Sequence, residues 1–481
     1  MTTPQKDELL AALRDICGAK YVLTEDADTS PYLTDWRGHY RGRAIAVVRP
    51  GNTDDVSRIL ALANTHSLPV VPQGGNTSLC GGATPDDTGR AVVLSLTRMD
   101  RIRSLDVNSR TIVVEAGCIL ENIQKEAEKH GLLFPLNFGS RGTCRIGGNL
   151  STNAGGLNVV RYGNARSLCL GLEVVVADGR VMNLLSPLKK DNTGYDLKNL
   201  FIGAEGTLGV ITAATLQLFP QPKAVATAFA GVRDINAAIE LLNRCQEASG
   251  GMVTAFELMP RSILENVTRH FPEVSFPIAD PPPFSALIEI TSTAAGDALP
   301  GNDGSLPLNR MMESLLEGAF EDDLVTDATI AASENQRDMI WAVRELTPES
   351  EIKAGPAYKS DISIPIEHMA GFYARAAKEA DDIAPGVKIF GFGHLGDGNL
   401  HYNLSIPEDG HEDFPSLYPR FDAMLSSLLS EYGGSISAEH GIGQKKRVML
   451  QHTKDKTALD LMAAIKAALD PKGIMNPGKI I

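Results

Sequence analysis

The chain has 481 residues, too many for one typical hydrophobic core, so two or three domains are expected. A net charge of -14 at pH 7 argues against general binding to nucleic acid or to anionic membranes. No apolar run reaches the roughly 18 residues that a membrane span needs. Six scattered cysteines without a C-x-x-C pair fit free thiols in a reducing cytosol, and the N-terminus shows no signal or transit pattern. We therefore expect a cytoplasmic protein.

The sequence pattern predicts a helix over residues 4–18, a strand over 44–50, a helix over 53–66 and a strand over 69–72. The last three of these elements form a βαβ unit in this interpretation. The second strand runs into a glycine-rich loop, residues 73–82, whose exposed N–H groups and hydroxyls would suit a phosphate. A glycine-rich surface loop without a ligand is the alternative.

A second glycine-rich stretch covers residues 139–156, and most of its residues are Gly, Ser, Thr or Asn. Such a segment is too small and polar for a core, but it can wrap a polar ligand with backbone and hydroxyl donors. A strand is predicted at 170–177, and a polar loop at 190–196 precedes residues 200–212. The composition changes after residues 218–223, where we place a domain boundary. Beyond it, we predict helices at 236–248 and 332–346 and a strand at 286–290.

Residues 391–403 predict a β-hairpin, with His394 and His401 on either side of an Asp397-Gly398 turn. Because strand side chains alternate, His401 and Asn403 should point to the same face. With Glu439, the two histidines would form a three-ligand set for Zn²⁺ or a similar ion that leaves positions open for substrate. Two histidines of a glycine-rich turn without any metal are the alternative. The same stretch spells G-x-G-x-x-G, but no helix pattern follows, so we reject a dinucleotide site.

The three glycine-rich loops together resemble the FAD-binding flavoproteins of the vanillyl-alcohol-oxidase type, within the branch of D-2-hydroxyacid dehydrogenases. The resemblance rests on 72–78, on 146–156 and on 203–211, and it extends over nearly the whole chain. It implies FAD, held without a covalent bond because the first loop offers no histidine. The residues expected to bind it are Pro72, Gly74, Gly75, Asn76, Thr77, Ser78, Gly139, Ser140, Thr143, Gly147, Gly148, Asn149, Thr152, Asn153, Gly155, Gly156, Glu205, Gly209, Ile211 and Asn476.

The resemblance also implies the fold class, which is α+β. A two-subdomain FAD-binding domain of the vanillyl-alcohol-oxidase (PCMH) type is expected over residues 1–221, and an α+β substrate-binding cap domain over 222–425. Residues 426–481, with a helix at 457–469, are expected to complete the active site and to return to the FAD domain.

By the same resemblance, the reaction is oxidation of a D-2-hydroxyacid, and D-2-hydroxyglutarate, a dicarboxylate, is the expected substrate. Oxidation removes a hydroxyl proton and a hydride from the carbinol carbon. Zn²⁺, or Mn²⁺ or Co²⁺ in its place, would lower the pKa of the hydroxyl, flavin N5 would accept the hydride, and His440 would take the proton. The residues expected to bind the substrate are Arg344, Thr347, Lys359, Asn403 and His440. Thr347 lies one position nearer to Arg344 than the family pattern places its threonine.

An electron-transfer flavoprotein or a quinone-linked acceptor is expected to take the electrons, and the protein is expected to be a homodimer. D-lactate or D-malate is the alternative substrate. A zinc hydrolase using His394, His401 and Glu439, and a flavin-binding protein without catalysis, are the alternatives from other classes.

Overall fold

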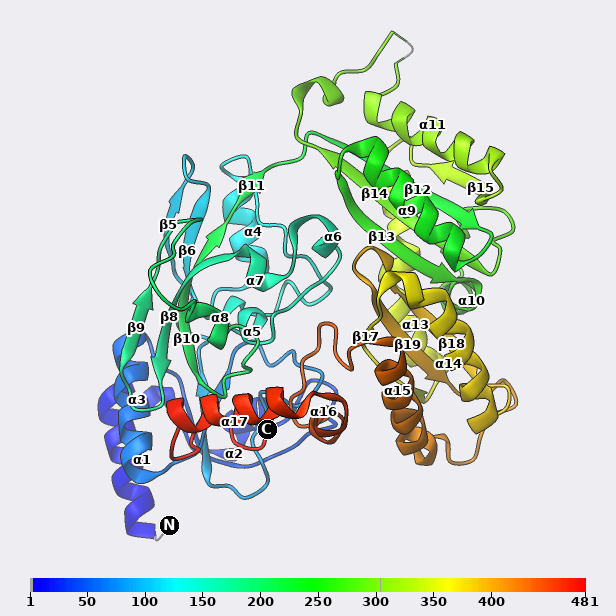
Figure 1. Ribbon diagram of the computed structural model, residues 1–481. Coiled ribbons are helices and arrows are strands. Elements are labelled where there is room, and N and C mark those ends of the chain that lie inside the picture. Colours follow the sequence, from blue (N-terminus) through cyan, green and yellow to red (C-terminus); the bar gives the residue numbers. More distant parts are fainter. Residues whose placement is uncertain (1–2, 303) are drawn as a thin grey trace. The chain divides into compact units, whose positions relative to one another are not determined.

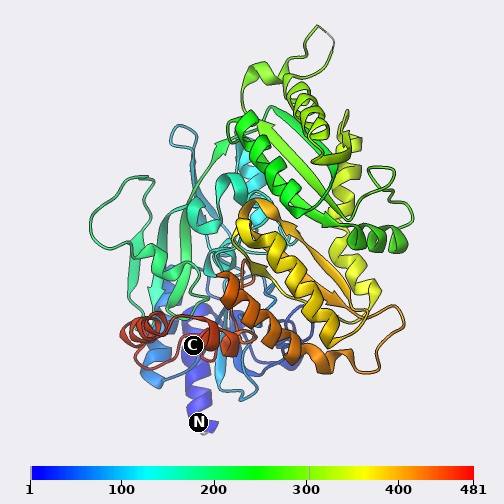
Figure 2. The same ribbon diagram turned by 45° about the vertical axis from the view of Figure 1, so that its right-hand side comes forward.

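The computed structural model describes residues 3–302 and 304–481, which form two compact units. Of the described residues, unit 1 contains 3–155, 164–220 and 439–481, and unit 2 contains 156–163, 221–302 and 304–438. Figure 1 labels many elements of both units, and Figure 2 shows the same ribbon from a second direction. The boundary expected at 425/426 would cut through a helix, α15 (Tyr418–Tyr432), which packs on α14 (Met369–Ile383) in unit 2. The chain leaves unit 2 only after Ala438.

Unit 1 has two main sheets and a two-stranded ribbon. The four-stranded sheet has the order β1-β2-β4-β3, and the five-stranded antiparallel sheet has the order β5-β6-β10-β8-β9. Their strands are β1 (Val22–Leu23), β2 (Ala44–Val48), β3 (Val70–Gln73), β4 (Ala91–Ser95), β5 (Ile102–Asp106), β6 (Thr111–Glu115), β8 (Cys169–Val176), β9 (Val181–Leu184) and β10 (Gly209–Gln217); β7 (Leu132–Leu133) and β11 (Phe219–Pro220) form the ribbon.

The helices of unit 1 agree with the predicted ones where their sequence pattern is long. Asn52 caps the predicted helix at 53–66 by accepting a hydrogen bond from the backbone N–H of Asp55 at 2.9 Å. The helices are α1 (Thr3–Cys17), η1 (Ala19–Tyr21), α2 (Asp26–Leu33), α3 (Thr53–His66), α4 (Leu120–Glu128), α5 (Ile146–Ser151), α7 (Ala165–Leu168), α8 (Lys198–Phe201), α16 (Arg447–Thr453) and α17 (Lys456–Leu469).

The βαβ interpretation is right about the elements but incomplete about their pairing. β2 and β3 are not neighbours, because β4 lies between them and pairs in parallel with both. The C-terminal segment runs beside β3: Val70 donates to the carbonyl of Ile474, and Asn476 donates to the carbonyl of Val70, each at 2.8 Å. The last residues of the chain thus return to unit 1, next to the first glycine-rich loop.

Unit 2 is built on an eight-stranded sheet with the order β15-β12-β14-β13-β18-β19-β16, and β17 pairs with β19. Helices α9 and α11 lie side by side, as do α14 and α15 (Figures 1 and 2). The strands are β12 (Ala224–Val232), β13 (Val253–Pro260), β14 (Phe284–Ser292), β15 (Val325–Ile330), β16 (Ala357–Tyr358), β17 (Ile362–Ser363), β18 (Lys388–His394) and β19 (Asn399–Ser405).

Buried apolar side chains of α10, α12 and the strands form the core of unit 2, with Phe229, Trp341, Phe390 and Phe392 among them. Asp234 caps α9, which ends at Gly250 in the left-handed conformation that glycine favours. The helices are α6 (Val159–Tyr162), α9 (Ile235–Ser249), α10 (Arg261–His270), η2 (Ala295–Ala298), α11 (Pro307–Glu321), α12 (Glu334–Glu345), α13 (Thr347–Ala354), η3 (Ile366–His368), α14 (Met369–Ile383), η4 (Leu395–Asp397), η5 (Phe414–Leu417) and α15 (Tyr418–Tyr432).

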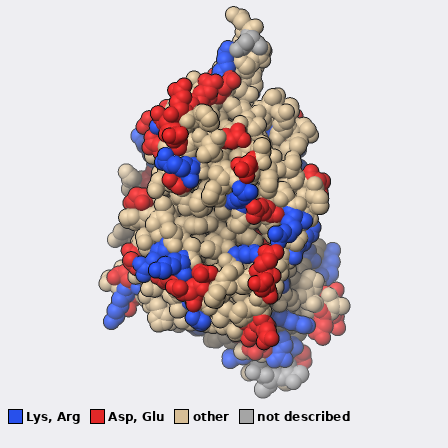
Figure 3. Space-filling model, turned by 90° about the vertical axis from the view of Figure 1, so that its right-hand side faces the viewer, with Lys and Arg blue, Asp and Glu red and all other residues tan. Residues whose placement is uncertain are grey.

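All six cysteines are buried with free thiols, as the sequence predicts. No helix among the described residues is both long and apolar enough to span a bilayer. The face drawn in Figure 3 carries basic and acidic side chains interspersed with one another, so the negative net charge does not form a single acidic surface there.

Candidate functional site

The first glycine-rich loop follows β3 and lies against the second glycine-rich loop within unit 1. A Cβ on Gly75 would lie 2.4 Å from the carbonyl oxygen of Thr143, so this position needs glycine. The side-chain amide of Gln73, just before the loop, donates to the carbonyls of Tyr32 and Ala83, each at 2.9 Å. The loops expected to bind FAD are therefore in contact, and the first of them is anchored where it leaves its strand.

Four of the residues expected to bind FAD have a left-handed backbone although they are not glycine. Their φ angles are 54° at Asn76, 52° at Asn153, 49° at Glu205 and 42° at Asn476. Each such residue costs on the order of 1–3 kcal/mol, and residues of this kind cluster where a backbone is shaped around a ligand. The four come from the three glycine-rich loops and from the C-terminal segment, all of them in unit 1.

Asn476 joins the C-terminal segment to two of these loops. Its Nδ2 donates to the carbonyls of Gly82 at 2.9 Å and of Glu205 at 2.7 Å, while its Oδ1 is buried without a partner among the described residues. The buried Oδ1 of Asn149, in the second loop, also lacks a partner within the described part of the chain. Buried acceptors of this kind call for a donor. Unpaired amide oxygens beside glycine-rich loops fit a polar cofactor such as FAD.

Glu205, which the resemblance assigns to cofactor binding, also holds the segment that follows His440. Its two carboxylate oxygens accept hydrogen bonds from the backbone N–H groups of Ile442 at 2.7 Å and of Gly443 at 2.8 Å. Burial raises the pKa of Glu205, and these two hydrogen bonds act in the opposite direction. The carboxylate thus fixes the segment that begins two residues after His440, the residue expected to be the base.

The other residues expected to bind FAD lie in the same three stretches, which include the end of β3, helix α5 and the start of β10. All of them belong to unit 1 except Gly156, which is the first residue of the short segment 156–163 in unit 2. That segment is held by Arg161, whose Nη1 donates to the carbonyl and the hydroxyl of Thr291 at 2.6 and 2.7 Å. The second glycine-rich loop therefore passes from one unit into the other.

The hairpin that carries the two histidines forms as expected, with a short 3₁₀ turn, η4, between β18 and β19. His401 is the direct partner of Phe392 in the ladder, and His394 lies two residues further along, on the same face. The two imidazole rings are 5.7 Å apart between centroids and nearly perpendicular. His394 is 6% exposed, while the side chain of His401 is 15% exposed. Two imidazoles held this close are suited to bind one metal ion.

Carboxylates that the sequence analysis did not single out lie next to both histidines. Glu257 of β13 contacts His394 Nδ1 through Oε1, and it accepts a hydrogen bond from Nε of Arg344 at 2.6 Å through Oε2. Asp361 lies 3.8 Å from Nδ1 of His401. Complete burial alone would raise the pKa of Glu257, but the neighbouring His394 and Arg344 outweigh burial and lower it to about 2. Glu257 is the only charged residue in the apolar stretch 252–260, and that is a signal that sequence inspection could have used.

Lys359 and Asn403, both expected to bind substrate, meet at a second buried carboxylate, Glu351. Lys359 Nζ lies 3.0 Å from Oε2 of Glu351, and Asn403 Nδ2 donates to Oε1 at 2.7 Å. The Oδ1 of Asn403 accepts from the backbone N–H of Ser360 at 3.1 Å. Asn403 and His401 share one face of β19, so Asn403 and its partner Glu351 lie on the same side of this strand as His401.

Thr347 is fully buried, and its hydroxyl donates to the carbonyl of Val343 at 3.0 Å, one helical turn earlier. A contact between Thr347 and the substrate stays a prediction. Arg344 is 8% exposed and its guanidinium lies 4.9 Å from the Phe392 ring, beside the histidine-bearing hairpin.

Glu439 and His440 are the first residues of the last segment of unit 1, and they follow Ala438 of unit 2 directly in the chain. Within unit 1, a Cβ on Gly155 would lie 2.5 Å from Oε1 of Glu439, so Glu439 touches the end of the second glycine-rich loop. The third expected metal ligand and the expected base therefore belong to the segment that Glu205 fixes.

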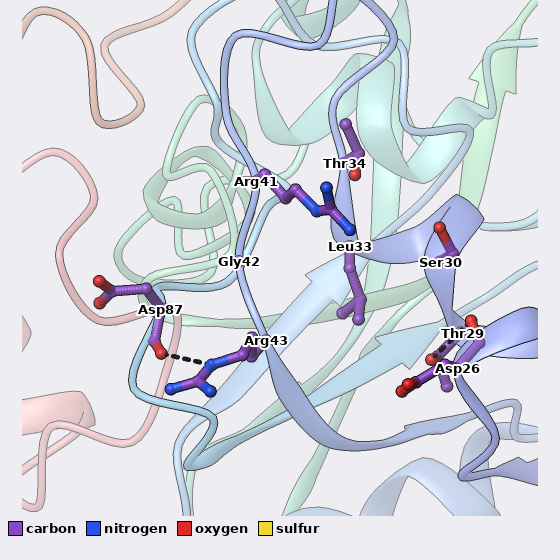
Figure 4. A pocket seen from close by; sticks show the side chains of 9 residues that line it. All are labelled: Asp26, Thr29, Ser30, Leu33, Thr34, Arg41, Gly42, Arg43 and Asp87. Carbon is purple, nitrogen blue, oxygen red and sulfur yellow. Dashed lines mark hydrogen bonds between the residues drawn. The ribbon is translucent and has the colours of Figure 1, made fainter.

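A separate cavity of about 590 Å³ lies in unit 1 (Figure 4). Arg41 and Arg43 line it together with the acidic residues Asp26 and Asp87, and Arg43 Nε donates to the carbonyl of Asp87 at 2.9 Å. None of the residues expected to act in binding or catalysis lines this cavity. Thr34 links its lining to the first glycine-rich loop, because the Thr34 carbonyl accepts from Asn76 Nδ2 at 2.8 Å.

The arrangement of sheets in the two units is that of known FAD-dependent oxidases. A crystal structure of p-cresol methylhydroxylase with substrate bound matches 100% of this chain and 97% of its own chain, with a TM-score of 0.75 and 16% sequence identity. The family model for the FAD binding domain matches residues 44–185, and that for the C-terminal domain of FAD linked oxidases matches residues 221–480. The expected α+β fold of the vanillyl-alcohol-oxidase type is thereby confirmed.

Two relatives match at higher identity. The mitochondrial D-2-hydroxyglutarate dehydrogenase of Bos taurus is 39% identical over 478 residues, which cover 99% of this chain and 84% of the relative. The enzyme of the same name from Arabidopsis thaliana is 38% identical over 97% of this chain and 80% of the relative. This chain belongs to the FAD-linked oxidase family, in the group that contains these dehydrogenases, and it is an FAD-dependent oxidoreductase.

The same relatives contradict the cytoplasmic location that the sequence analysis expects. Both carry the name of a mitochondrial enzyme, and they point to mitochondria rather than to the cytoplasm. The physical reason for the error is that the expectation took the scattered cysteines, without a C-x-x-C pair, as free thiols of a reducing cytosol. Such thiols indicate reducing surroundings and do not distinguish one reducing compartment from another.

Proposed function

We propose that this FAD-dependent oxidoreductase oxidises D-2-hydroxyglutarate to 2-oxoglutarate. The observation that carries the proposal is the similarity to D-2-hydroxyglutarate dehydrogenases over nearly the full chain. Unit 2 adds a physical reason for a dicarboxylate, because it presents two cationic side chains, Arg344 and Lys359, around one histidine-bearing hairpin. Arg offers a planar fork to one carboxylate and Lys a compact charge to the other.

Each of these cations has a buried anionic partner. In the hydrogen bonds of the described residues, Arg344 uses Nε toward Glu257, so its two Nη groups remain for a substrate carboxylate. Lys359 Nζ contacts Glu351, and Asn403 donates to the same carboxylate from β19. The carboxylates thus hold both cations in place before the substrate binds, which lowers the entropy lost on binding.

We propose His394, His401 and Glu439 as ligands of a divalent cation, with Zn²⁺ as the first candidate and Mn²⁺ or Co²⁺ as alternatives. Two imidazoles and one carboxylate are a common catalytic ligand set for zinc. When bound, the cation would polarise the substrate hydroxyl, and FAD would accept the hydride. His440 is our candidate for the base that takes the hydroxyl proton. The support is its place beside Glu439 and the fixing of the following peptide by Glu205.

The test is anaerobic mixing of the purified yellow protein with D-2-hydroxyglutarate, D-malate and D-lactate in turn, while the flavin absorbance is recorded. D-2-hydroxyglutarate should bleach the flavin with the highest kcat/KM of the three. A higher value for D-malate or D-lactate would replace the proposed substrate. An unchanged spectrum with all three would exclude D-2-hydroxyacid oxidation by this protein.

Removal of metal tests the cation separately. Dialysis against a chelator should abolish bleaching by D-2-hydroxyglutarate while the bound FAD is kept, and added ZnCl₂ should restore it. Full activity after removal of all metal, verified by elemental analysis, would contradict the metal site but not the flavin chemistry. The zinc hydrolase alternative is set aside, because both FAD family models match the chain.

For the reoxidation of the flavin we propose an electron-transfer flavoprotein as the acceptor, and we propose a homodimer as the assembly. Both rest on the family resemblance. Transfer of electrons from substrate-reduced protein to purified electron-transfer flavoprotein tests the first. Light scattering during size-exclusion chromatography tests the second, because a 51.5 kDa chain and its dimer differ twofold in mass.

A further inference from the structure

Glu257 is a fully buried carboxylate, and the proposed function uses only its contact with Arg344. It stands on β13 among apolar residues that are all buried, and its own exposure is 0%. An ionised carboxylate in such a place is costly unless it is paired and hydrogen-bonded. Its partners therefore indicate what the side chain does.

One oxygen of Glu257 is paired with Arg344, at 2.6 Å from Nε. This ion pair offsets the charge of the buried carboxylate. The other oxygen contacts Nδ1 of His394, and the backbone geometry prepares this contact, because Glu257 and His394 are direct partners in the ladder between β13 and β18. Side chains of directly opposed residues lie on the same side of a sheet, so little freedom remains between them.

A contact at Nδ1 decides which nitrogen of the imidazole is left for a ligand. When Nδ1–H donates to a carboxylate, Nε2 carries a lone pair and is the nitrogen that can bind a metal ion. Carboxylates in this position orient metal-binding histidines and make them more basic. Glu289 of β14 makes a useful comparison: it is also a buried glutamate of this sheet, but its carboxylate accepts from Thr227 Oγ1 at 3.0 Å and from Trp341 Nε1 at 2.9 Å.

We propose that Glu257 is a positioning residue that fixes His394 with its Nε2 available to the divalent cation, with Arg344 as the counter-charge that makes this buried carboxylate tolerable. The inference rests on the proposed function, because it requires that His394 is a metal ligand. Glu257 itself does not touch the cation in this assignment; it acts through the imidazole.

The proposal predicts that Glu257→Gln weakens metal binding without abolishing it. Glutamine keeps the size of the side chain, but it loses the charge that attracts the Nδ1 proton and pairs with Arg344. Loss of such an outer carboxylate commonly lowers metal affinity by about 10- to 100-fold. The matched control is Glu289→Gln, the same change in a buried glutamate of the same sheet that contacts neither His394 nor Arg344.

The experiment is calorimetric titration of ZnCl₂ into the full-length, FAD-containing protein after its metal has been removed with a chelator. Flavin absorbance and circular dichroism establish that each variant is folded and loaded with FAD. Zn²⁺ should bind E257Q with a Kd about 10- to 100-fold higher than that of the wild type, and E289Q should bind it with the wild-type Kd. The readout is the affinity for the metal, which a merely structural role of Glu257 would not change in a folded protein.

Equal Zn²⁺ affinity of folded E257Q and wild type would overturn the role of Glu257 while leaving the metal site intact. An equal loss in E289Q would also overturn it, because the effect would then come from any buried glutamate of the sheet. If the wild type binds no divalent cation, the proposed metal site fails, and this inference fails with it.

Should E257Q not fold, Glu257→Asp keeps the charge but shortens the side chain by one methylene. It should then show a several-fold loss of Zn²⁺ affinity, and wild-type affinity in E257D would overturn the proposal.

Discussion

Lys359 and Glu351 form an ion pair in which Nζ lies 3.0 Å from Oε2, and the glutamate is 2% exposed while the lysine side chain is 24% exposed. The lysine is therefore held from its buried side and accessible from the other. This asymmetry is what a cation needs in order to be fixed in place and still contact a substrate.

Lys359→Ala should weaken binding of a dicarboxylate more than binding of a monocarboxylate. The variant removes a cation and also leaves Glu351 as an unpaired negative charge near the site. We expect KM for D-2-hydroxyglutarate to rise by about 10- to 100-fold, because hydrogen bonds to charged groups contribute about 1.5–3 kcal/mol. KM for D-lactate should change little. Lys378→Ala on the exposed side of α14 is the control, and equal losses for both substrates in K359A would contradict the assignment of Lys359.

Glu205→Gln should loosen the segment that follows His440. A carboxylate can accept from both Ile442 and Gly443, whereas a glutamine amide offers one acceptor and places an NH₂ group against the second N–H. The free energy of unfolding should fall by about 2–3 kcal/mol, since a buried N–H would be left unsatisfied. Thermal unfolding and the FAD content of the purified protein are the measurements. Glu128→Gln, at an exposed position of α4, should leave both measurements unchanged. Wild-type values in E205Q would show that the hydrogen bonds from Ile442 and Gly443 to Glu205 are not needed.

The buried Lys479 should make the free energy of unfolding of the protein depend on pH. Burial lowers the pKa of its ammonium group from 10.5 to about 8. Between these values the unfolded chain binds more protons at this position than the folded one, so this lysine destabilises the fold fully below pH 8 and ceases to do so as pH rises toward 10.5. At pH 7 the cost is on the order of 3 kcal/mol.

Lys479→Met should therefore stabilise the protein at pH 7, and its advantage over the wild type should shrink as pH rises from 8 to 10. Denaturant unfolding at several pH values measures this difference directly. The exposed Lys456→Met should give a difference that does not vary with pH over this range. An advantage of K479M that stays constant up to pH 10 would contradict the depressed pKa.

Arg161→Met should release the segment 156–163 from unit 2. The guanidinium donates to the carbonyl and hydroxyl of Thr291, and methionine can keep the packing of the side-chain stem but not these bonds. Amide hydrogen exchange within 156–163 should become faster by about 10- to 100-fold, the equivalent of about 1.5–3 kcal/mol for hydrogen bonds to a charged group. Exchange in α9 serves as the internal reference, and Arg180→Met, on an exposed turn, as the control variant. Unchanged exchange in R161M would mean that other contacts hold the segment.

The sequence alone was sufficient for those elements whose signals are local. Helix α3 begins where Asn52 caps it, and the hairpin of His394 and His401 forms around Gly398, because capping and turn conformations involve neighbours within a few residues. The glycine-rich loops were recognisable for the same reason: small residues are required wherever a backbone approaches another backbone, as Gly75 approaches Thr143.

Only the tertiary structure decided which strands pair and which charges meet. β4 separates β2 from β3, and no periodicity within either strand could indicate this insertion. Glu257 contacts His394 although 137 positions separate them in the sequence, and Glu351 contacts Asn403 at a separation of 52. A carboxylate's partner depends on the register between distant strands and helices, which local residue patterns do not encode. The sequence could therefore name the histidines and the cations, but the buried glutamates that hold them became evident only once the chain was folded.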